Sequence, residues 1–149
     1  MTKPAELPVG PAVSSAPALF PGTVTLPGRY GSVERLSAGR HKAALWMAMH
    51  GHDAIWTYLA PGPFADQAAF DTYITECEQN KERIVYTVID DGGRAVGILS
   101  LMEIRPAMRV IEVGNIVYSP ARASVRTRLC APAIRCRAWR TRRCRGSFP

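Results

Sequence analysis

Two histidines and two aspartates are the residues of this chain that most suggest metal chemistry. His50 and His52 lie two residues apart, but no third ligand follows at a recognisable metal-site spacing. Asp90 and Asp91 are followed by two glycines, a pattern typical of a tight hairpin turn with solvated carboxylates. We therefore expect no metal site, and we interpret the histidines as residues that pack at a helix end or face solvent.

The four cysteines do not indicate a zinc site either. The spacing of Cys130, Cys136 and Cys144 matches no known zinc pattern. Cys77 falls on an apolar helical stripe and is most simply a thiol of the core.

The location of the protein is predicted from its first residues and its apolar runs. Five prolines between Pro4 and Pro21 interrupt any apolar signal-peptide core. No run approaches the roughly 20 apolar residues of a membrane span. We expect a cytoplasmic protein with reduced thiols, no membrane partner and an oligomeric state that the sequence does not reveal.

The chain changes character after Pro120. Residues 121–149 contain nine of the 19 Lys and Arg residues, all of them Arg, and no Asp or Glu. The first 120 residues carry 10 basic and 12 acidic residues, so the formal net charge of +7 arises from this last segment. The high isoelectric point therefore says nothing about the preceding domain.

Two interpretations of the Arg-rich segment remain open. One is an out-of-frame translation, because shifted codons of GC-rich DNA encode mainly Arg, Ala, Pro, Cys and Trp. The other is a basic extension in which Arg137, Arg140 and Trp139 contact phosphates and stack on a base, binding nucleic acid non-specifically. A block of like charges is more often a disordered tail, so we do not expect nucleic acid to be the partner.

Periodicity divides the chain into three segments. Residues 1–28 are expected to be an irregular arm rich in Pro and Ala, 29–120 a folded domain, and 121–149 the Arg- and Cys-rich tail. Within the domain, the pattern predicts strands over 29–36, 83–89, 96–104 and 110–118, helices over 39–50 and 66–80, and a short helical turn over 52–59. Ser37 and Asp66 are expected to begin the two helices. The order predicts an α+β fold with an antiparallel meander.

Four segments in this order resemble the GNAT superfamily of N-acetyltransferases, and in particular the branch that acetylates N-terminal alanines of ribosomal proteins. They are Gly51-His-Asp-Ala-Ile-Trp-Thr-Tyr-Leu59, Gly62-Pro-Phe64, Gly93-Arg-Ala-Val-Gly-Ile-Leu-Ser-Leu101 and Ile111-Glu-Val-Gly-Asn-Ile-Val-Tyr-Ser-Pro120. The resemblance covers about residues 29–120. It implies a mainly antiparallel GNAT sheet flanked by helices, and a transferase that moves an acetyl group from acetyl-CoA to an amine.

The resemblance also implies roles for the strand at 110–118. In the family, the backbone of this fourth strand binds the pantetheine arm of acetyl-CoA, which assigns cofactor binding to Ile116, Val117 and Tyr118. A carboxylate at the position of Glu112 acts as the base in several branches, because an ammonium has no lone pair until it loses a proton. The alternative for Glu112 is an exposed, solvated strand residue.

Four further residues are candidates for binding the acceptor. Trp56, Tyr58 and Phe64 lie where the acceptor-side loops of the family usually lie, although aromatic core packing explains them equally well. Asn115 could polarise a carbonyl or simply make a hydrogen bond at the strand end. The acceptor itself, whether a protein N-terminus or a small amine, is not encoded in any recognisable pattern.

The resemblance stops at about Pro120. The family next places a loop with two glycines, whose amides bind the pyrophosphate at the start of a helix. Residues 122–128 contain no glycine, and Pro132 would interrupt the helix. We therefore expect a GNAT domain truncated after its fourth strand, with impaired activity. Strand 110–118 is then expected to be a bare sheet edge unless the tail covers it.

Overall fold

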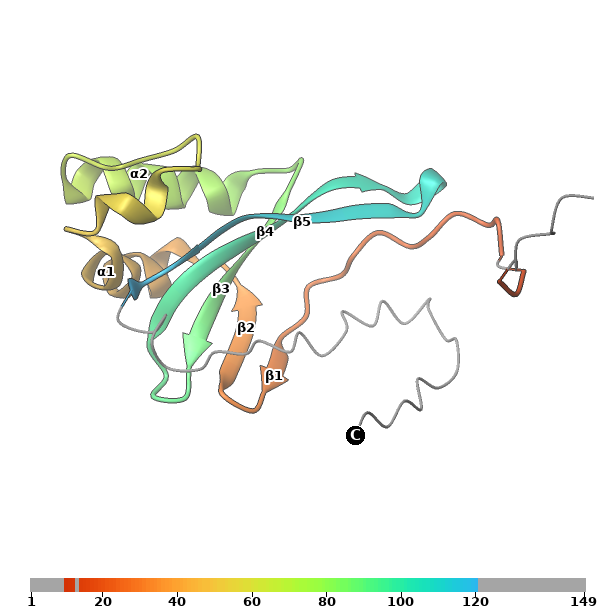
Figure 1. Ribbon diagram of the computed structural model, residues 1–149, viewed down its shortest axis with the longest axis horizontal. Coiled ribbons are helices and arrows are strands. Elements are labelled where there is room, and N and C mark those ends of the chain that lie inside the picture. The colour runs from red at the N-terminus through yellow and green to blue at the C-terminus, as the bar shows by residue number, and fades with distance from the viewer. Residues whose placement is uncertain (1–9, 13, 121–149) are drawn as a thin grey trace, which may run out of the picture.

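The computed structural model describes residues 10–12 and 14–120 (Figure 1). The predictions for residues 121–149 lie outside the described residues. Two helices, two short 3-10 helices and five strands follow one another in the order β1 (Leu26–Gly28), β2 (Gly31–Arg35), α1 (Ala38–Met49), η1 (Asp53–Trp56), α2 (Gln67–Gln79), β3 (Ile84–Asp90), β4 (Ala95–Arg105), η2 (Pro106–Met108) and β5 (Val110–Tyr118).

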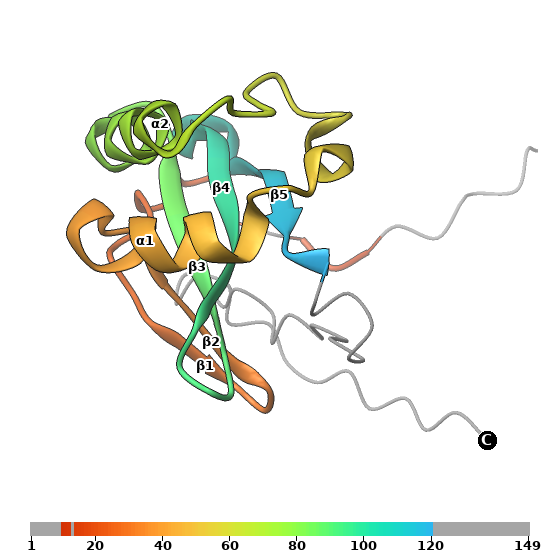
Figure 2. The same ribbon diagram turned by 90° about the vertical axis from the view of Figure 1, so that its left-hand side faces the viewer.

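The five strands form one antiparallel sheet in the order β1-β2-β3-β4-β5, and both helices pack on the same face of it (Figure 2). The predicted α+β meander is confirmed, and the predicted bounds of β5 are those of the structure. The short strand β1 was not predicted, because Leu-Pro-Gly carries no strand pattern. It forms because Leu26 pairs with Val33 of β2 across a tight turn.

Successive side chains of β3 and β4 point to opposite faces of the sheet, and both faces carry a cluster of apolar residues. On the helix-covered face, Val85 and Ile98 join the buried stripes of α1 and α2 in the main core. On the opposite face, Ile84, Tyr86 and Leu101 form a second, smaller cluster. Both faces of the central strands are therefore buried, which explains their nearly continuous apolar sequence.

A buried polar cluster joins α1 to the sheet. The backbone N–H of Ser37 donates to Nδ1 of His41 at 3.1 Å, and Nε2 of His41 lies 2.9 Å from a carboxylate oxygen of Glu34 on β2. The hydroxyl of Thr87 on β3 lies 3.1 Å from the same Nδ1. Because Nδ1 accepts from the backbone, the neutral ring carries its proton on Nε2 and donates it to Glu34.

His41 also lies in the buried face of α1. The helix buries Ala38, His41, Leu45 and Met49, so a histidine takes a place among the apolar residues of this face. Ser37 is the N-cap, as expected, but its side chain makes no capping hydrogen bond. Its backbone N–H bonds the His41 ring instead.

Helix α2 begins as the sequence predicts. The Asp66 carboxylate accepts the backbone N–H of Ala69 at 2.8 Å, and Phe70, Ile74 and Cys77 are buried at helical spacing. Burial raises the pKa of the Cys77 thiol. The thiol is therefore protonated and packs as a core residue at neutral pH.

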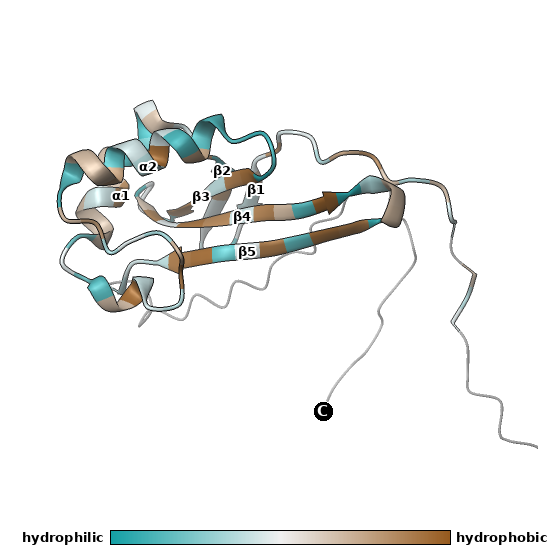
Figure 3. Ribbon diagram, turned by 90° about the horizontal axis from the view of Figure 1, so that it is seen from above, coloured by the Kyte–Doolittle hydropathy of each residue, from teal (hydrophilic) through white to brown (hydrophobic). Residues whose placement is uncertain are grey.

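The N-terminal arm, residues 14–25, runs along the second face of the sheet toward the β4–β5 hairpin (Figures 1 and 3). The Tyr86 hydroxyl reaches the Gly22 carbonyl at 3.5 Å, the Ala18 N–H donates to the Pro106 carbonyl at 2.9 Å, and Arg109 donates to the Ala16 carbonyl at 2.9 Å. These three hydrogen bonds attach the irregular arm to the domain. Within the described part of the chain, no helix is long and apolar enough to cross a membrane.

The first prediction contrasts two glycines. A Cβ on Gly97 of β4 would lie 2.5 Å from the Tyr118 ring and 2.8 Å from the Val117 carbonyl, whereas a Cβ on Gly39 of α1 would contact nothing within 4 Å. We expect Gly97→Ala to lower the free energy of unfolding by about 1–3 kcal/mol, because strand β5 must shift. Gly39→Ala should raise it by about 0.5 kcal/mol through helix propensity.

Urea unfolding of both variants measures these changes. A Gly97→Ala variant as stable as the unmodified chain would show that Tyr118 does not pack on the backbone of β4.

Candidate functional site

Strand β5 is irregular at its centre, where it gains one residue relative to β4. Gly97 pairs with Tyr118 and Ile98 with Val117, but Ser100 pairs with Gly114, so the register shifts between these pairs. The extra residue is on β5, since two of its residues lie opposite one of β4. This is a β-bulge, which bends a strand and turns backbone groups away from the regular ladder.

Asn115 is the residue that makes the bulge possible. Its φ of 48° lies in the left-handed region, which asparagine tolerates better than most residues with a side chain. The sequence analysis singled out Asn115 for its side-chain amide. The structure instead assigns it a backbone feature that sequence spacing alone could not reveal.

The outer side of β5 is open among the described strands, since β5 is the last strand of the sheet and pairs only with β4. Figure 3 shows hydrophobic residues along its length. The exposed fractions of Val110, Ile111, Val113 and Ile116 lie between 43% and 46%. Among the described strands β5 is therefore an edge strand, and the tail that was expected either to cover it or to leave it bare lies outside the described residues.

The three residues expected to bind the cofactor lie just beyond the bulge. Ile116 is exposed, Val117 is buried in the core at 2% exposure, and Tyr118 is half-buried. The Tyr118 ring occupies the space that Gly97 leaves free. Burial raises the pKa of Tyr118, so its hydroxyl is protonated at neutral pH and able to donate a hydrogen bond.

Glu112 precedes the bulge and is exposed. It pairs with Met102 on β4. A Cβ built on Gly114 would lie 3.2 Å from Oε1 of Glu112, so the carboxylate lies over the glycine backbone next to the bulge. Glu112 and Asn115 therefore lie near each other on β5. The exposure of the Glu112 side chain is also what a solvated strand residue would show.

The predicted aromatic acceptor residues separate into two groups. Trp56 is buried and Phe64 is half-buried, and their rings meet edge to face at a centroid distance of 5.1 Å. Tyr58 is 98% exposed and contributes to no described cluster. Trp56 and Phe64 pack on the core, as the alternative interpretation held, and at the same time they line a small pocket.

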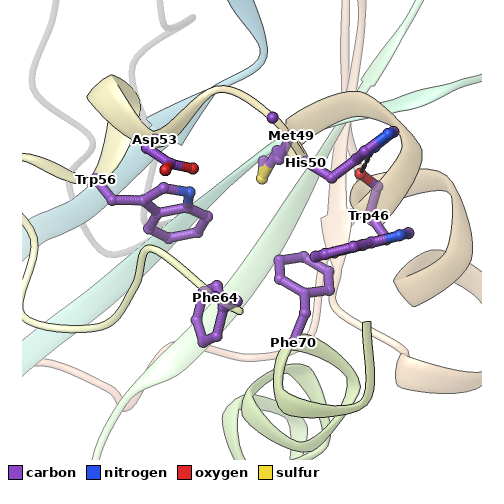
Figure 4. Close-up of a pocket in the computed structure, with 8 residues that line it drawn as sticks. Trp46, Met49, His50, Asp53, Trp56, Phe64 and Phe70 are labelled. Atoms are coloured by element: carbon purple, nitrogen blue, oxygen red, sulfur yellow. Dashed lines mark hydrogen bonds between the residues drawn. The ribbon is translucent and has the colours of Figure 1, made fainter. Parts of the chain in front are cut away.

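This pocket lies between the end of α1, η1 and the start of α2 (Figure 4). Its lining residues are Trp46, Met49, His50, Gly51, Asp53, Trp56, Phe64 and Phe70. Helix η1 also contacts β5, so it connects the pocket side of the domain with the bulged strand. Trp46 and Phe70 belong to different segments, and no sequence motif links them. Only folding brings the two rings to a centroid distance of 5.5 Å.

The histidines show no metal-binding arrangement in the part of the chain that the structure describes. His50 stacks on Trp46 at a centroid distance of 5.3 Å, and its Nδ1 lies 2.9 Å from the Trp46 carbonyl, so it packs at the end of α1. His52 is exposed. Among residues 10–12 and 14–120, no group of three or more His, Cys, Asp or Glu residues could hold a metal ion.

Comparison with solved structures identifies the class of fold. A GCN5-related N-acetyltransferase from Brucella melitensis superposes with a TM-score of 0.68 and 30% sequence identity, covering 71% of this chain and 49% of that one. A probable acetyltransferase of the GNAT family from Chromobacterium violaceum ATCC 12472 gives a TM-score of 0.68 and 30% identity, covering 83% of this chain and 64% of that one. No protein-family model matches the chain, and a search of curated proteins finds no match.

The resemblance to the GNAT superfamily predicted from the sequence is therefore confirmed, and the chain has a GNAT fold. These neighbours are acyltransferases by name. The chain spans about half the length of the first neighbour and less than two thirds of the second. The comparisons do not distinguish the branch that acts on ribosomal proteins.

The second prediction concerns the bulge. We expect Asn115→Val to lower the free energy of unfolding by about 1–2 kcal/mol, because a β-branched residue is strained in the left-handed region. Asn115→Gly should be close to neutral, since glycine adopts a positive φ without steric cost. Chemical denaturation of the two variants tests this, and equal destabilisation by both would mean that the Asn115 side chain, and not its backbone, stabilises β5.

Proposed function

We propose that this domain binds acetyl-CoA along β5 and transfers its acetyl group to an amine. The observation that supports the proposal best is the bulge at Asn115 on an open strand of a GNAT fold. A bulged strand with an unpaired outer side offers N–H and C=O groups to an extended ligand, much as an added strand would use them. Ile116, Val117 and Tyr118 would supply these groups to the pantetheine arm.

The reaction requires little covalent chemistry from the protein. The neutral amine nitrogen attacks the thioester carbonyl carbon and the carbon–sulfur bond breaks. The CoA thiolate leaves and takes up the proton that the new amide nitrogen loses. Glu112 would remove the proton from the ammonium form of the acceptor, directly or through water. Its carboxylate lies beside Gly114, one residue before Asn115, on the same strand as the backbone groups that we propose bind the pantetheine arm.

We propose further that transfer by this chain is slow. Residues 122–128 lack the two glycines with which the family binds the pyrophosphate. Without those backbone amides, acetyl-CoA would bind more weakly than it does when the loop is present. Acceptors of the family include protein N-termini and small amines, and the branch that acts on ribosomal-protein alanines is the first to test.

Thermal unfolding in the presence of acetyl-CoA tests the binding. A ligand at ten times its Kd stabilises the native state by about 1.4 kcal/mol, which raises Tm by about 4 °C or more for a domain of this size. We expect such a rise with millimolar acetyl-CoA and none with ATP at the same concentration. No shift with acetyl-CoA would contradict the proposal.

A Glu112→Gln variant tests the base. We expect CoA release in the presence of saturating amine to fall about 10²- to 10⁴-fold, because glutamine cannot accept the proton. The thermal shift with acetyl-CoA should not change. Glu103→Gln is the matched control, since Glu103 is an exposed glutamate on β4 that pairs with Arg105. Equal rates for the two variants would exclude Glu112 as the base.

A further inference from the structure

Strands β4 and β5 continue beyond the rest of the sheet as a two-stranded ribbon, residues 102–112, with η2 at its tip (Figures 1 and 3). Ile84, the first residue of β3, pairs with Leu101, so the part of β4 that follows pairs with β5 and not with β3. An isolated two-stranded ribbon is at best marginally stable in water. The ribbon therefore depends on contacts with other parts of the chain.

The backbone of the hairpin is irregular on both sides of the point where the ribbon leaves the sheet. Within the described residues, the positive φ values outside glycine are those of Glu103, Arg109 and Asn115, at 49°, 57° and 48°. The register shift between Met102 and Arg105 places an extra residue on β4, whereas the extra residue at Asn115 is on β5. Bulges bend strands, and backbone in sparsely populated regions persists only where its surroundings hold it. A change in the orientation of the ribbon would therefore be absorbed at these two bulges.

Side-chain packing holds the ribbon only near its base. Ile104 packs against the second apolar cluster of the sheet. Nearer the tip, Met108, Val110 and Ile111 are exposed, with exposed fractions of 66%, 46% and 43%. Apolar burial therefore contributes little to the position of the tip.

The N-terminal arm, residues 14–25, supports the tip by hydrogen bonds. The N–H of Ala18 donates to the Pro106 carbonyl at 2.9 Å, and the Arg109 guanidinium donates to the Ala16 carbonyl at 2.9 Å. At its other end the arm continues into β1, the first strand of the sheet, whereas the ribbon extends from β5, the last strand. The arm thus connects the two edges of the sheet across its second face.

The bulge at Asn115 separates the two parts of the candidate site. On the sheet side, Val117 is 2% exposed and belongs to the main core, which fixes the segment that we propose binds the pantetheine arm. On the ribbon side, Glu112 pairs with Met102. The position of Glu112 relative to Val117 is therefore set by how the ribbon is held.

We propose that the N-terminal arm is a strap that fixes the ribbon and thereby holds Glu112 in place for acetyl transfer. The inference rests on the proposed function and adds that a segment outside the candidate site controls its rate. Loosening the strap should slow transfer at saturating acetyl-CoA and leave cofactor binding unchanged, because residues 116–118 stay attached to the core. The arm is a positioning element, since it acts through the ribbon.

Hydrogen exchange of the full chain tests the strap. Ala18→Pro removes the N–H that donates to Pro106, and Ala12→Pro, which also follows a proline but precedes the arm, is the matched control. We expect Ala18→Pro to speed exchange of the ribbon amides about fivefold, the factor that corresponds to the loss of one hydrogen bond, while the amides of β3 do not change. Ribbon exchange at the unmodified rate in Ala18→Pro would overturn the proposal.

A second variant removes the other hydrogen bond of the arm without altering the arm itself. Arg109→Gln deletes the guanidinium that donates to Ala16. Arg105→Gln, on the same ribbon, is its control, because Arg105 pairs with Glu103. We expect faster ribbon exchange in Arg109→Gln and not in Arg105→Gln. Equal acceleration in both would mean that the charges of the ribbon, and not the arm, stabilise it.

The kinetics of CoA release test the effect on Glu112. In Ala18→Pro we expect kcat to fall about fivefold, while KM for acetyl-CoA and the thermal shift with acetyl-CoA stay as in the Ala12→Pro control. A purely structural role of the arm would lower stability without this split. Faster ribbon exchange with an unchanged kcat would refute the link to Glu112.

The two proposals fail in different ways. If acetyl-CoA does not stabilise the unmodified chain, acetyl transfer and the effect on Glu112 are refuted together, and the exchange rates still decide whether the arm holds the ribbon. If acetyl-CoA stabilises the chain but ribbon exchange is the same in every variant, the proposed function stands and the strap is refuted.

Discussion

The pairing of β5 with β4 is the constraint on which the rest of this structure depends. It works because Gly97 has no side chain, so the Tyr118 ring can lie against the backbone of β4 while Val117 enters the core. Ser119 continues the contact, since its N–H donates to the Val96 carbonyl at 2.8 Å. The same pairing positions the bulge at Asn115, and Glu112 lies on the same strand as this bulge. A change in this register by one residue would move every side chain of β5 to the other face of the sheet.

The candidate site has a firm side and an open side. On the firm side, η1 and the aromatic residues of α1 and α2 pack into the main core, so the pocket cannot widen without disturbing it. On the open side, β5 carries exposed Val and Ile residues along an edge that no other described strand covers. Packing thus fixes the side chains on the firm side, whereas the backbone groups on the outer side of β5 are paired with no other described strand.

Much of the fold could be predicted because its signals are local. Alternating Val and Ile residues define β3 to β5, the turn at Asp90 separates two of these strands, and Asp66 begins α2 by capping it. The left-handed φ of Asn115 could not be predicted, since many asparagines follow a glycine without forming a bulge. The burial of His41 was equally hidden. It depends on Glu34, which lies on the neighbouring strand β2, and on Thr87, which is distant in sequence and becomes a partner only in the folded chain.

The candidate site was likewise predictable only in those parts that are continuous in the sequence. Resemblance to a family located β5 and the aromatic segment around Trp56, because both are short continuous motifs. The pocket combines residues from three segments, and neither Trp46 nor Phe70 carries a motif of its own. Tyr58 illustrates the reverse case, since an aromatic residue inside a motif can point entirely into solvent.

The attachment of the N-terminal arm has a consequence for how the molecule forms. Its three hydrogen bonds to the domain join residues far apart in the sequence, the most distant of them, Ala16 and Arg109, separated by 93 positions. Loop closure grows costlier by about 0.6 kcal/mol for each doubling of length, and such contacts form only after local structure has shortened the effective path. The contacts of the arm with Pro106 and Arg109 therefore require that β4 and β5 have already formed their hairpin.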